Sequence, residues 1–256
     1  MKRLVAAAIV IALAGGPSLV RAQAQPPEPS HATLASQNEA ILTELKAIRQ
    51  LLEKLTAAQS SAQQGSSSSP QVVRVRNSNQ LVLGSADAPL TMIEFTDLEC
   101  PFCRQYAATG FEEIRKAWID TGRLRYLARD LPLDSHVHSL MSARAARCAG
   151  DQQRFWEMRT TLMKNGNLLS PEFIAKTAEG LKLDMKAFNA CAASTTHDAE
   201  IQADVTEAVK LNLRGTPTFV IGRTTPDEIE GIMLVGAQPF AAFDATLKAL
   251  LPAGSR

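Results

Sequence analysis

Residues 90–103 read LTMIEFTDLECPFC, a strand-forming run that leads directly into two cysteines separated by two residues. The first seven residues are apolar or β-branched apart from one glutamate, which is the pattern of a buried strand. Residues 101–119 then carry apolar side chains at helical spacing, and residues 124–129 alternate apolar with basic side chains, as a second strand does. The order strand, helix, strand predicts a parallel pair of strands with a right-handed crossover.

The chain continues this pattern on both sides and encloses a helical segment. Short apolar or β-branched runs predict further strands at residues 71–75, 218–221 and 232–235, and a closing helix at residues 240–251. Residues 138–212 are helical almost throughout, with breaks at Gly150 and Gly166. We therefore expect an α/β domain in two parts, residues 71–136 and 214–256, with a helical insertion between them at residues 137–213.

The bulk composition excludes several classes of protein. With 45% hydrophobic and 21% charged residues, the 256-residue chain is neither disordered nor fibrous. Four cysteines are too few for a disulfide-stapled scaffold, so each must be explained by its local setting. The 27 Lys and Arg residues balance 26 Asp and Glu residues, and we expect no nucleic-acid partner.

The Cys-Pro-Phe-Cys segment carries the clearest chemistry. Cys100 would cap the helix and Pro101 would occupy its first position, where a missing N–H costs nothing. The Cys100 sulfur then faces free backbone N–H groups and the positive end of the helix dipole, which favour a thiolate. Cys100 is therefore the predicted nucleophile, and Cys103, one helical turn further on, is the predicted resolving cysteine.

Two other interpretations of this cysteine pair were weighed. A purely structural disulfide is one, although a strand-to-helix corner is a reactive setting for a thiol. A zinc site is the other, but the chain has no second Cys-x-x-Cys and no His pair at finger spacing. We predict no metal and no cofactor.

Glu94 interrupts the apolar strand that precedes the cysteines. Strand alternation turns its side chain inward, near the base of the helix that begins at Cys100. A buried carboxylate is costly unless it has a task, and this one is suited to exchange protons with Cys103. The alternative is an edge-strand glutamate that faces water.

Gly215-Thr216-Pro217-Thr218 precedes another apolar strand. Proline cannot donate to a sheet ladder, and a cis bond before Pro217 is one way to accommodate it, although trans is the commoner isomer. A cis bond would leave the Thr216 backbone free to pair with an extended peptide beside the cysteines. The candidate substrate-binding residues are therefore Thr216 and Pro217, together with Pro101 and Phe102 between the cysteines.

Phe102 has a further candidate role at the surface. Together with Leu131 and Leu133 it can line an apolar groove around Cys100 that receives unfolded chains. The alternative is that these side chains belong to the core.

The N-terminus predicts export. Lys2 and Arg3 precede an apolar run, residues 4–14, and a small-residue site, Ala-Gln-Ala, ends at Ala24. We expect cleavage after Ala24, which makes residues 1–24 a signal peptide. The alternative, an uncleaved anchor, is disfavoured because the run is much shorter than the ~20 residues of a spanning helix. An exported chain meets an oxidising compartment, in which disulfides persist.

Residues 25–64 predict a Pro-rich start followed by a coiled-coil helix. One set of side chains occupies the two apolar heptad positions, and only Asn38 interrupts it: Leu34, Ile41, Leu45, Ile48, Leu52 and Leu55. Glu44 and Arg49 lie where neighbouring parallel chains would pair. We expect an oligomerisation stalk, a dimer or trimer, joined by a flexible linker at residues 65–70. The alternative is an amphipathic helix folded back on its own domain.

Together these features resemble the DsbA-like thiol-disulfide oxidoreductases of the thioredoxin fold. The resemblance covers residues 71–251 and rests on Cys-Pro-Phe-Cys after an apolar strand, Glu94 upstream of Cys100, an all-helical insertion, and Thr-Pro before the last strands. It implies a thioredoxin fold with an inserted helical domain, a cis Pro217, a buried Glu94 and a nucleophilic Cys100. One departure is Phe102, where the oxidase archetype has histidine, and this change implies a weaker oxidant.

The N-terminal heptads are a second departure from the monomeric oxidases. They are similar to the stalks of periplasmic disulfide isomerases and of suppressor-of-copper-sensitivity relatives. This similarity implies a periplasmic homo-oligomer that shuffles or reduces disulfides of unfolded or misfolded exported proteins containing cysteine, served by a membrane thiol-disulfide redox partner. The nearest alternative is a DsbA-like dithiol oxidase that introduces disulfides. A third is a copper-binding or chaperone module, because soft thiolates bind copper(I).

Cys148 and Cys191 both lie in the expected helical insertion. In an oxidising compartment they predict a structural disulfide between two helices, and some DsbA relatives carry one there. A regulatory second redox pair and two buried free thiols are the alternatives. His136 and His138 are interpreted as residues of the loop and helix start, and a metal-binding role for them is the alternative.

Overall fold

The computed structural model describes residues 31–64, 71–77 and 81–251. It divides into two compact units, residues 1–66 and 67–256. The predicted signal peptide at residues 1–24, its cleavage site and the predicted linker at residues 65–70 lie outside the described residues.

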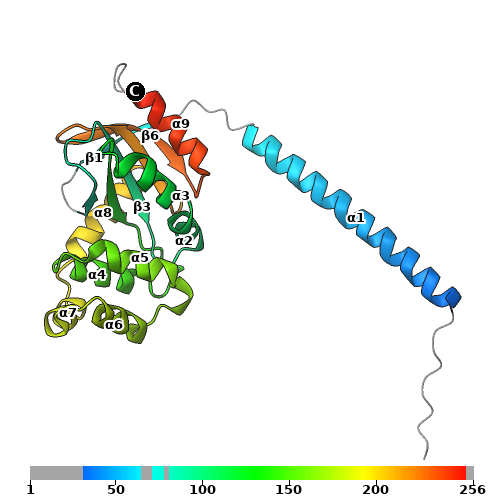
Figure 1. Ribbon diagram of the computed structural model, residues 1–256, viewed down its shortest axis with the longest axis horizontal. Coiled ribbons are helices and arrows are strands. Elements are labelled where there is room, and N and C mark those ends of the chain that lie inside the picture. Colours follow the sequence, from blue (N-terminus) through cyan, green and yellow to red (C-terminus); the bar gives the residue numbers. More distant parts are fainter. Residues whose placement is uncertain (1–30, 65–70, 78–80, 252–256) are drawn as a thin grey trace, which may run out of the picture. The chain divides into compact units, whose positions relative to one another are not determined.

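The described part of the first unit is one helix, α1 (His31–Gln64), of 34 residues (Figure 1). Three side chains of the predicted heptad series, Ile41, Leu45 and Ile48, are 54%, 55% and 53% exposed. Arg49 donates to Glu53 one turn further along the same helix, at 2.9 Å. The side chains of Leu34 and Leu55 lie outside the described set. The helix therefore presents an apolar stripe that is open to solvent in the single chain.

The second unit is built on a six-stranded sheet in the order β1-β6-β5-β3-β4-β2. The strands are β1 (Val72–Arg76), β2 (Val82–Leu83), β3 (Leu90–Thr96), β4 (Leu124–Asp130), β5 (Thr218–Arg223) and β6 (Glu228–Val235). β3 and β4 are parallel, as the crossover requires, and the other pairs are antiparallel. Glu94 lies between Ala128 of β4 and Phe219 of β5 in the register, so it is near the centre of the sheet.

The helices belong to three parts of the chain: the crossover between β3 and β4, the insertion, and the segments that follow it. The crossover from β3 to β4 contains α2 (Pro101–Ala108), α3 (Gly110–Ile114) and a π-helical turn, η1 (Arg115–Ile119). The insertion contains α4 (Ser139–Gly150), α5 (Phe155–Lys164), the short 3-10 turn η2 (Gly166–Leu168), α6 (Pro171–Gly180) and α7 (Met185–Ala192). After these come α8 (Asp198–Lys210) and, near the C-terminus, α9 (Phe240–Leu250).

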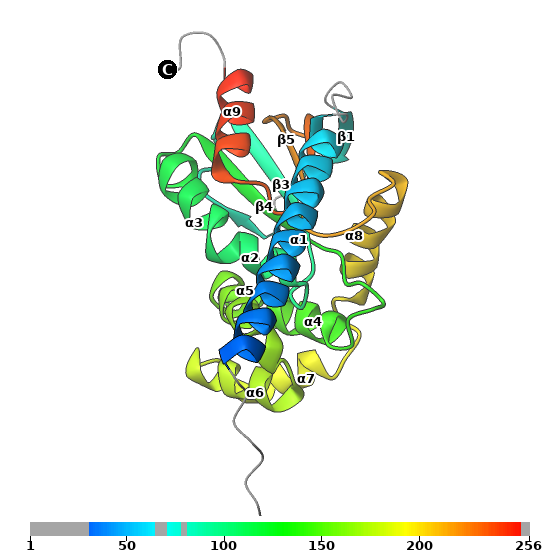
Figure 2. The same cartoon turned by 90° about the vertical axis from the view of Figure 1, so that its right-hand side faces the viewer.

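The sheet is covered on both faces (Figure 2). On one face, α2, α3 and α9 pack on a core that includes Met92, Tyr126 and Phe243. On the other, α8 contributes Ala208 to a core with Ile93. Helices α4 to α7 gather at one end of the sheet in both views and enclose a third core. The α/β class and the helical insertion predicted from the sequence are confirmed.

Helix α8 packs differently from the other helices of the segment at residues 137–213. It contacts β4 and shares the core on one face of the sheet. Arg129 of β4 and Arg147 of α4 each bind Asp204 of α8 at 2.6 Å. These buried ion pairs join α8 and α4 to the sheet.

The single helix expected over residues 101–119 is interrupted in the structure. α2 ends at Ala108, and α3 begins at Gly110, whose Cβ position would lie 3.1 Å from the ring of Tyr106. A side chain at this position would require that ring to shift by a few tenths of an ångström, so glycine suits the close packing there. Strand β6 also begins earlier than expected, at Glu228, because its first residues alternate exposed acids with the buried Ile229.

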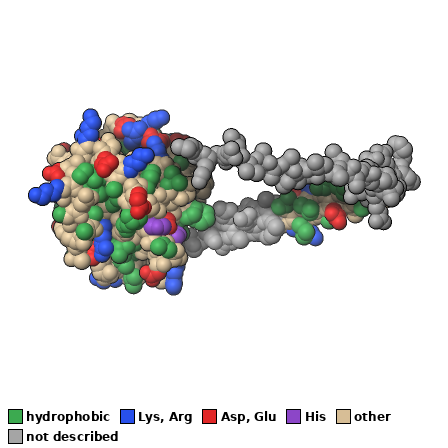
Figure 3. All heavy atoms as spheres, turned by 90° about the horizontal axis from the view of Figure 1, so that it is seen from below, with side chains coloured by type: hydrophobic (Ala, Val, Ile, Leu, Met, Phe, Trp, Pro, Cys, Tyr) green, Lys and Arg blue, Asp and Glu red, His purple; other side chains and the backbone are tan. Residues whose placement is uncertain are grey.

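The surface of the second unit carries mixed charge. On the face that Figure 3 shows, basic and acidic side chains are interspersed among apolar and polar ones. This agrees with the near balance of 27 basic and 26 acidic residues in the chain.

No helix in the described part of the chain is both long and apolar enough to cross a membrane.

Candidate active site

Cys100 caps the N-terminus of α2, and Pro101 is the first helical residue. The Cys100 backbone is extended (φ −61°, ψ 125°), and its carbonyl accepts the N–H of Arg104 at 3.1 Å. The residue is only 4% exposed. A cysteine at this position faces the unpaired N–H groups of the first helical turn, as the sequence predicted from local rules.

The surroundings of Cys100 favour its thiolate. A hydrogen bond from the Cys103 thiol is the largest cause, and it outweighs burial, which acts in the opposite direction. The Thr216 side chain and the backbone N–H groups of Cys103 and Phe102 contribute further. Together they lower the pKa of Cys100 to about 5, so at neutral pH this sulfur is ionised.

Cys103 is held in the opposite state. Its side chain is fully buried, and burial raises its pKa far above that of an ordinary thiol. The hydrogen bond to Cys100 and the negative charge of Glu94 act in the same direction. The pair therefore consists of one ionised sulfur and one protonated sulfur, which is the arrangement that stepwise thiol-disulfide exchange uses.

The Thr216-Pro217 bond is cis. The Thr216 carbonyl lies 3.4 Å from the Cys100 sulfur, although the two residues are 116 positions apart in the chain. The Pro217 carbonyl is occupied, because it accepts the N–H of Gly236 at 2.8 Å. The structure thus brings Thr216 and Pro217 together with Cys100.

The candidate residues between the cysteines lie at the surface. Phe102 is 62% exposed, and Pro101 is exposed beside it. Leu133 is partly buried. The expectation that Leu131 lines the same groove is wrong: this residue is 8% exposed and packs in the core that includes Ile93. Leu131 continues the alternation of β4, so its side chain joins that of Leu127 on the face of the sheet that α8 covers.

Glu94 is completely buried and belongs to an ionic pair that the sequence analysis missed. Its Oε2 accepts the Tyr126 hydroxyl at 2.5 Å and the guanidinium of Arg159. Arg159 is 1% exposed and comes from α5 of the insertion. Its guanidinium lies 5.5 Å from the centroid of the Trp156 ring. The carboxylate therefore has a buried cation supplied by a distant helix.

A signal for Arg159 was present in the sequence. It lies on the buried face of α5 with Phe155, Met158, Leu162 and Met163, which recur at helical spacing. A single arginine on an otherwise apolar face is expected to pair with a buried acid. The pattern does not say which acid, because Glu94 is 65 residues away.

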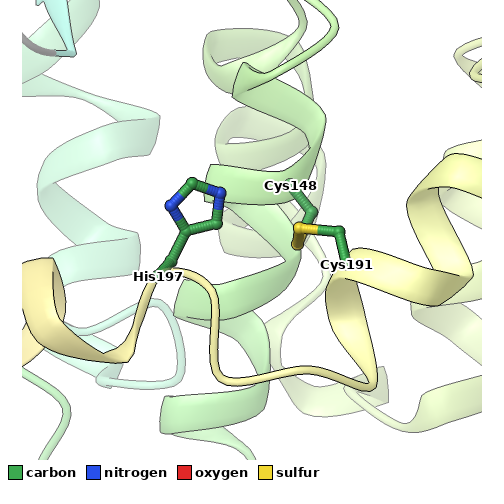
Figure 4. A group of neighbouring side chains, drawn as sticks. All are labelled: Cys148, Cys191 and His197. Atoms are coloured by element: carbon green, nitrogen blue, oxygen red, sulfur yellow. A yellow bond between two sulfur atoms is a disulfide. The ribbon is translucent and has the colours of Figure 1, made fainter.

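Cys148 and Cys191 form a disulfide that joins α4 to α7, with Cα atoms 5.8 Å apart (Figure 4). His197 lies beside it and binds Glu200 at 2.7 Å and Asp151 at 2.9 Å. Burial disfavours the charged imidazole, but these two acids outweigh it and raise the pKa of His197. Because the two sulfurs are bonded to each other, neither is a thiolate that could bind a metal ion with His197.

Comparison with solved structures shows the same architecture in DsbA proteins. *Wolbachia pipientis* alpha-DsbA1 is 24% identical, with a TM-score of 0.61, over 68% of this chain and 92% of that chain. DsbA2 from *Pseudomonas aeruginosa* is 25% identical, with a TM-score of 0.55, over 70% and 98%. BdbD from *Bacillus subtilis* is 22% identical, with a TM-score of 0.60, over 70% and 97%. The chain therefore shares the fold of DsbA proteins, and its paired cysteines lie at the start of α2.

The family model described as thioredoxin matches residues 76–232, which is more than half of the chain. This chain belongs to the thioredoxin family.

Curated relatives at higher identity are longer proteins. A Na(+)/H(+) antiporter, NhaA 3 of *Salinispora tropica*, is 35% identical over 165 residues, which is 63% of this chain and 25% of the antiporter. The NhaA of *Herminiimonas arsenicoxydans* is 30% identical over 168 residues, 66% of this chain and again 25% of the antiporter. The chain thus spans about a quarter of the length of these relatives.

Proposed function

We propose that the chain is an exported thiol-disulfide interchange enzyme that acts on cysteine-containing proteins, as an oligomeric isomerase or reductase. The observation that carries thiol-disulfide interchange is the contrast between its two neighbouring sulfurs, whereas the isomerase or reductase assignment rests on the proposed stalk. The pKa of Cys100 is lowered to about 5, whereas burial raises that of Cys103. One sulfur is therefore ready to attack, and the other keeps its proton until the second step.

The first step forms a mixed disulfide. The Cys100 thiolate attacks one sulfur of a substrate disulfide, the substrate S–S bond breaks, and the other substrate sulfur leaves as a thiolate that takes up a proton. In isomerisation, a thiolate of the substrate then attacks the mixed disulfide and releases Cys100 as a thiolate. A new substrate disulfide forms, and no electrons are gained or lost overall.

Reduction uses Cys103 instead. Cys103 gives up its proton, and its thiolate attacks the Cys100 sulfur of the mixed disulfide. The bond to the substrate breaks, the substrate leaves as a second thiol, and a Cys100–Cys103 disulfide forms. Two electrons have then passed from the enzyme to the substrate, and a membrane thiol reductase would have to restore the dithiol.

Glu94 is the proposed proton acceptor for Cys103. Its Oε2 binds Tyr126 and Arg159, while Oε1 has no hydrogen-bond partner among the described residues. The guanidinium of Arg159 holds Oε2 in place, so Oε1 is the atom proposed to accept the proton. The effect of the Glu94 charge on the pKa of Cys103 supports a direct electrostatic link between them.

The surface around Cys100 supports protein substrates. The exposed ring of Phe102 offers an apolar contact next to the reactive sulfur. We propose that the Thr216 backbone, beside the cis Pro217, pairs with an extended segment of the substrate. Such contacts involve the backbone and the apolar side chains of the substrate and require no particular sequence. They therefore suit unfolded or misfolded client proteins of many sequences.

We further propose that α1 joins several chains into a dimer or trimer. Its stripe of Ile41, Leu45 and Ile48 is more than half exposed in the single chain. These residues follow heptad spacing, and such a stripe is buried when copies of the helix pair. Several catalytic units on one stalk would act together on one client and raise its effective concentration.

We also propose that the protein acts in the periplasm. The charged and apolar pattern of residues 1–24 supports export, and the Cys148–Cys191 disulfide supports an oxidising environment. Both suit the periplasm, where exported proteins with cysteines would be the clients.

A dithiol oxidase is the second candidate, and one observation favours it. A Cys100 pKa of about 5 stabilises the reduced enzyme, which makes the disulfide form a stronger oxidant. In this case substrate thiols would be oxidised, and a membrane partner would accept the electrons.

Refolding of a protein with scrambled disulfides tests the proposal. Full-length mature protein and a variant that lacks residues 25–66 are each added in reduced form to the scrambled substrate. We expect the full-length protein to restore native disulfides faster than the truncated one. If neither repairs the substrate while both, in oxidised form, rapidly oxidise a reduced protein, the isomerase proposal is wrong and the oxidase alternative holds.

A further inference from the structure

Two acid–histidine pairs connect the turn that carries Cys100 to the loop that enters the inserted helices. Nδ1 of His136 lies 2.7 Å from Oδ2 of Asp97. Nδ1 of His138 lies 3.3 Å from Oε1 of Glu99, and the His138 N–H donates to Oε2 of the same residue at 2.7 Å. Both acids come within three residues before Cys100. The loop is thus held against the segment that positions the reactive sulfur.

Asp97 contacts the neighbourhood of both sulfurs. Its carbonyl accepts the Cys100 N–H at 3.1 Å, and its own N–H lowers the pKa of Cys103 by a hydrogen bond to that sulfur. Its carboxylate accepts the N–H groups of Glu99 at 2.8 Å and Leu133 at 2.9 Å. These bonds fix Asp97 on the turn that carries Cys100, so the charge of its side chain stays near that turn.

That charge opposes the Cys100 thiolate unless it is compensated. The Asp97 side chain is 0% exposed, so water screens it little, and a negative neighbour disfavours a thiolate. His136, with a side chain 22% exposed, supplies a positive charge when it is protonated. The hydrogen bond to Asp97 raises the pKa of His136, and the charges of Cys100 and Glu99 raise it further. Electrostatic coupling between two titrating groups is mutual, so the imidazolium also favours the Cys100 thiolate.

Other charged groups around His136 are acidic or already paired. Asp134 and Asp198 line the same surface hollow as His136. Asp198 is bound by Arg144 at 2.6 Å, which offsets its charge. The charged groups around the imidazole are therefore Asp97, Glu99 and the Cys100 sulfur, which act on it directly, and Asp134 and the paired Asp198 of the same hollow. All of these favour the protonated ring.

We propose that His136, held by Asp97, is a positioning residue that supplies the positive charge for the Cys100 thiolate and makes the reactivity of this cysteine pH dependent. The Pro101-Phe102 pair between the cysteines carries no charge, and the cation comes from a separate loop instead. This inference rests on the proposed function, because it takes Cys100 as the attacking sulfur.

The effect must be measured in acid, where Cys100 titrates. With a pKa of about 5, half of the Cys100 sulfur is ionised at pH 5, and almost all of it at pH 7. If the loss of the imidazolium moves the midpoint upward by about one pH unit, the ionised fraction at pH 5 falls roughly fivefold. At pH 7 the same shift changes the ionised fraction by only about a tenth.

The test is alkylation of the full-length reduced protein by iodoacetamide between pH 4 and 8, with the modified cysteine identified by mass. The main variant is His136→Asn, whose amide can still donate to Asp97 but carries no charge. The matched control is His138→Asn on the same loop. We expect H136N to react roughly fivefold more slowly at pH 5 and almost normally at pH 7. The His138 variant is expected to stay within about twofold of the unmodified chain.

A measurement without any variant keeps the inference testable if H136N fails to fold. NMR titration of the His136 ring is carried out on reduced and on oxidised protein. The coupling requires a higher His136 midpoint in the reduced protein, where the thiolate is present. Equal midpoints in the two states would overturn the proposal. So would an unchanged alkylation profile in H136N, or an equal shift in the His138 variant.

These outcomes are distinct from failure of the proposed function. If the unmodified protein shows no acidic midpoint at Cys100, the assignment of the nucleophile is wrong. If that midpoint is present and H136N leaves it in place, only the role of His136 is wrong.

Discussion

Replacement of Arg159 by methionine tests how the insertion and the redox site are linked. In the native chain Glu94 and Arg159 are 0% and 1% exposed, and each is the charged partner of the other. R159M leaves a carboxylate in the interior with Tyr126 as its remaining hydrogen-bond donor among the described residues. Loss of one partner of a buried ion pair costs about 3–5 kcal/mol of unfolding free energy. For a domain of this size, that loss lowers Tm by roughly 6–20 °C.

The matched double variant separates charge from packing. In E94Q/R159M both charges are absent, and the methionine side chain fills much of the space of the arginine stem. We expect this variant to recover most of the stability lost in R159M, because a neutral buried pair carries little desolvation penalty. Arg159→Lys, which keeps the charge, is expected to fall between R159M and the native chain.

Urea unfolding followed by tryptophan fluorescence measures these differences. Trp118 and Trp156 both lie in the unit that contains the site, and Trp156 is close to Arg159. The second half-reaction, release of a substrate from the mixed disulfide, is measured on the same variants by rapid quenching. We expect it to slow in R159M, because the guanidinium that holds the proposed proton acceptor Glu94 in place is absent.

The reasoning would be refuted by either of two results. One is an R159M unfolding free energy within about 1 kcal/mol of the native value, well below the cost of an unpaired buried charge. The other is an E94Q/R159M variant that is no more stable than R159M, which would show that the cost comes from packing and not from charge.

Four further predictions follow from the site, the disulfide and the stalk. Cys103→Ala should accumulate a mixed disulfide with insulin on non-reducing gels, and the absence of any adduct would contradict its resolving role. The depressed pKa of Cys100, about 5, should make the reduced protein gain stability as pH rises from 5 toward ~8.5, and this gain should be absent below pH 5. The Cys100→Ser variant should lack the gain in urea unfolding. An identical pH profile in the native protein and in this variant would disprove the assignment. Replacement of Cys148 and Cys191 by serine should lower the unfolding free energy by about 3–4 kcal/mol, as expected for a cross-link over 43 residues, and an unchanged urea midpoint would contradict this. Ile48→Asp should reduce the mass of the particle in light scattering to that of one chain, and a native protein that is already monomeric would rule out the stalk.

Local rules were enough to place the cysteines. The N-cap position of Cys100 and the first-turn position of Pro101 depend only on the residues next to them, because a helix start is set by its own unpaired N–H groups. The inward direction of Glu94 follows from the alternation of one strand. The heptad spacing of α1 is equally local, although it does not identify the partner that covers the stripe.

Contacts between distant segments depended on the tertiary structure. The sequence marked Glu94 as a buried acid, but its cation comes from α5 of the insertion, and only the packing of that helix against α2 and α4 brings Arg159 to it. The approach of Thr216 to the Cys100 sulfur spans 116 residues. His136 is a loop residue, as the sequence predicted, but its partner Asp97 is identified only by the position of that loop in the tertiary structure. Periodicity predicts which face of a helix or strand is buried. The partner of a buried charge depends on how whole elements pack together, and a local sequence pattern does not predict that packing.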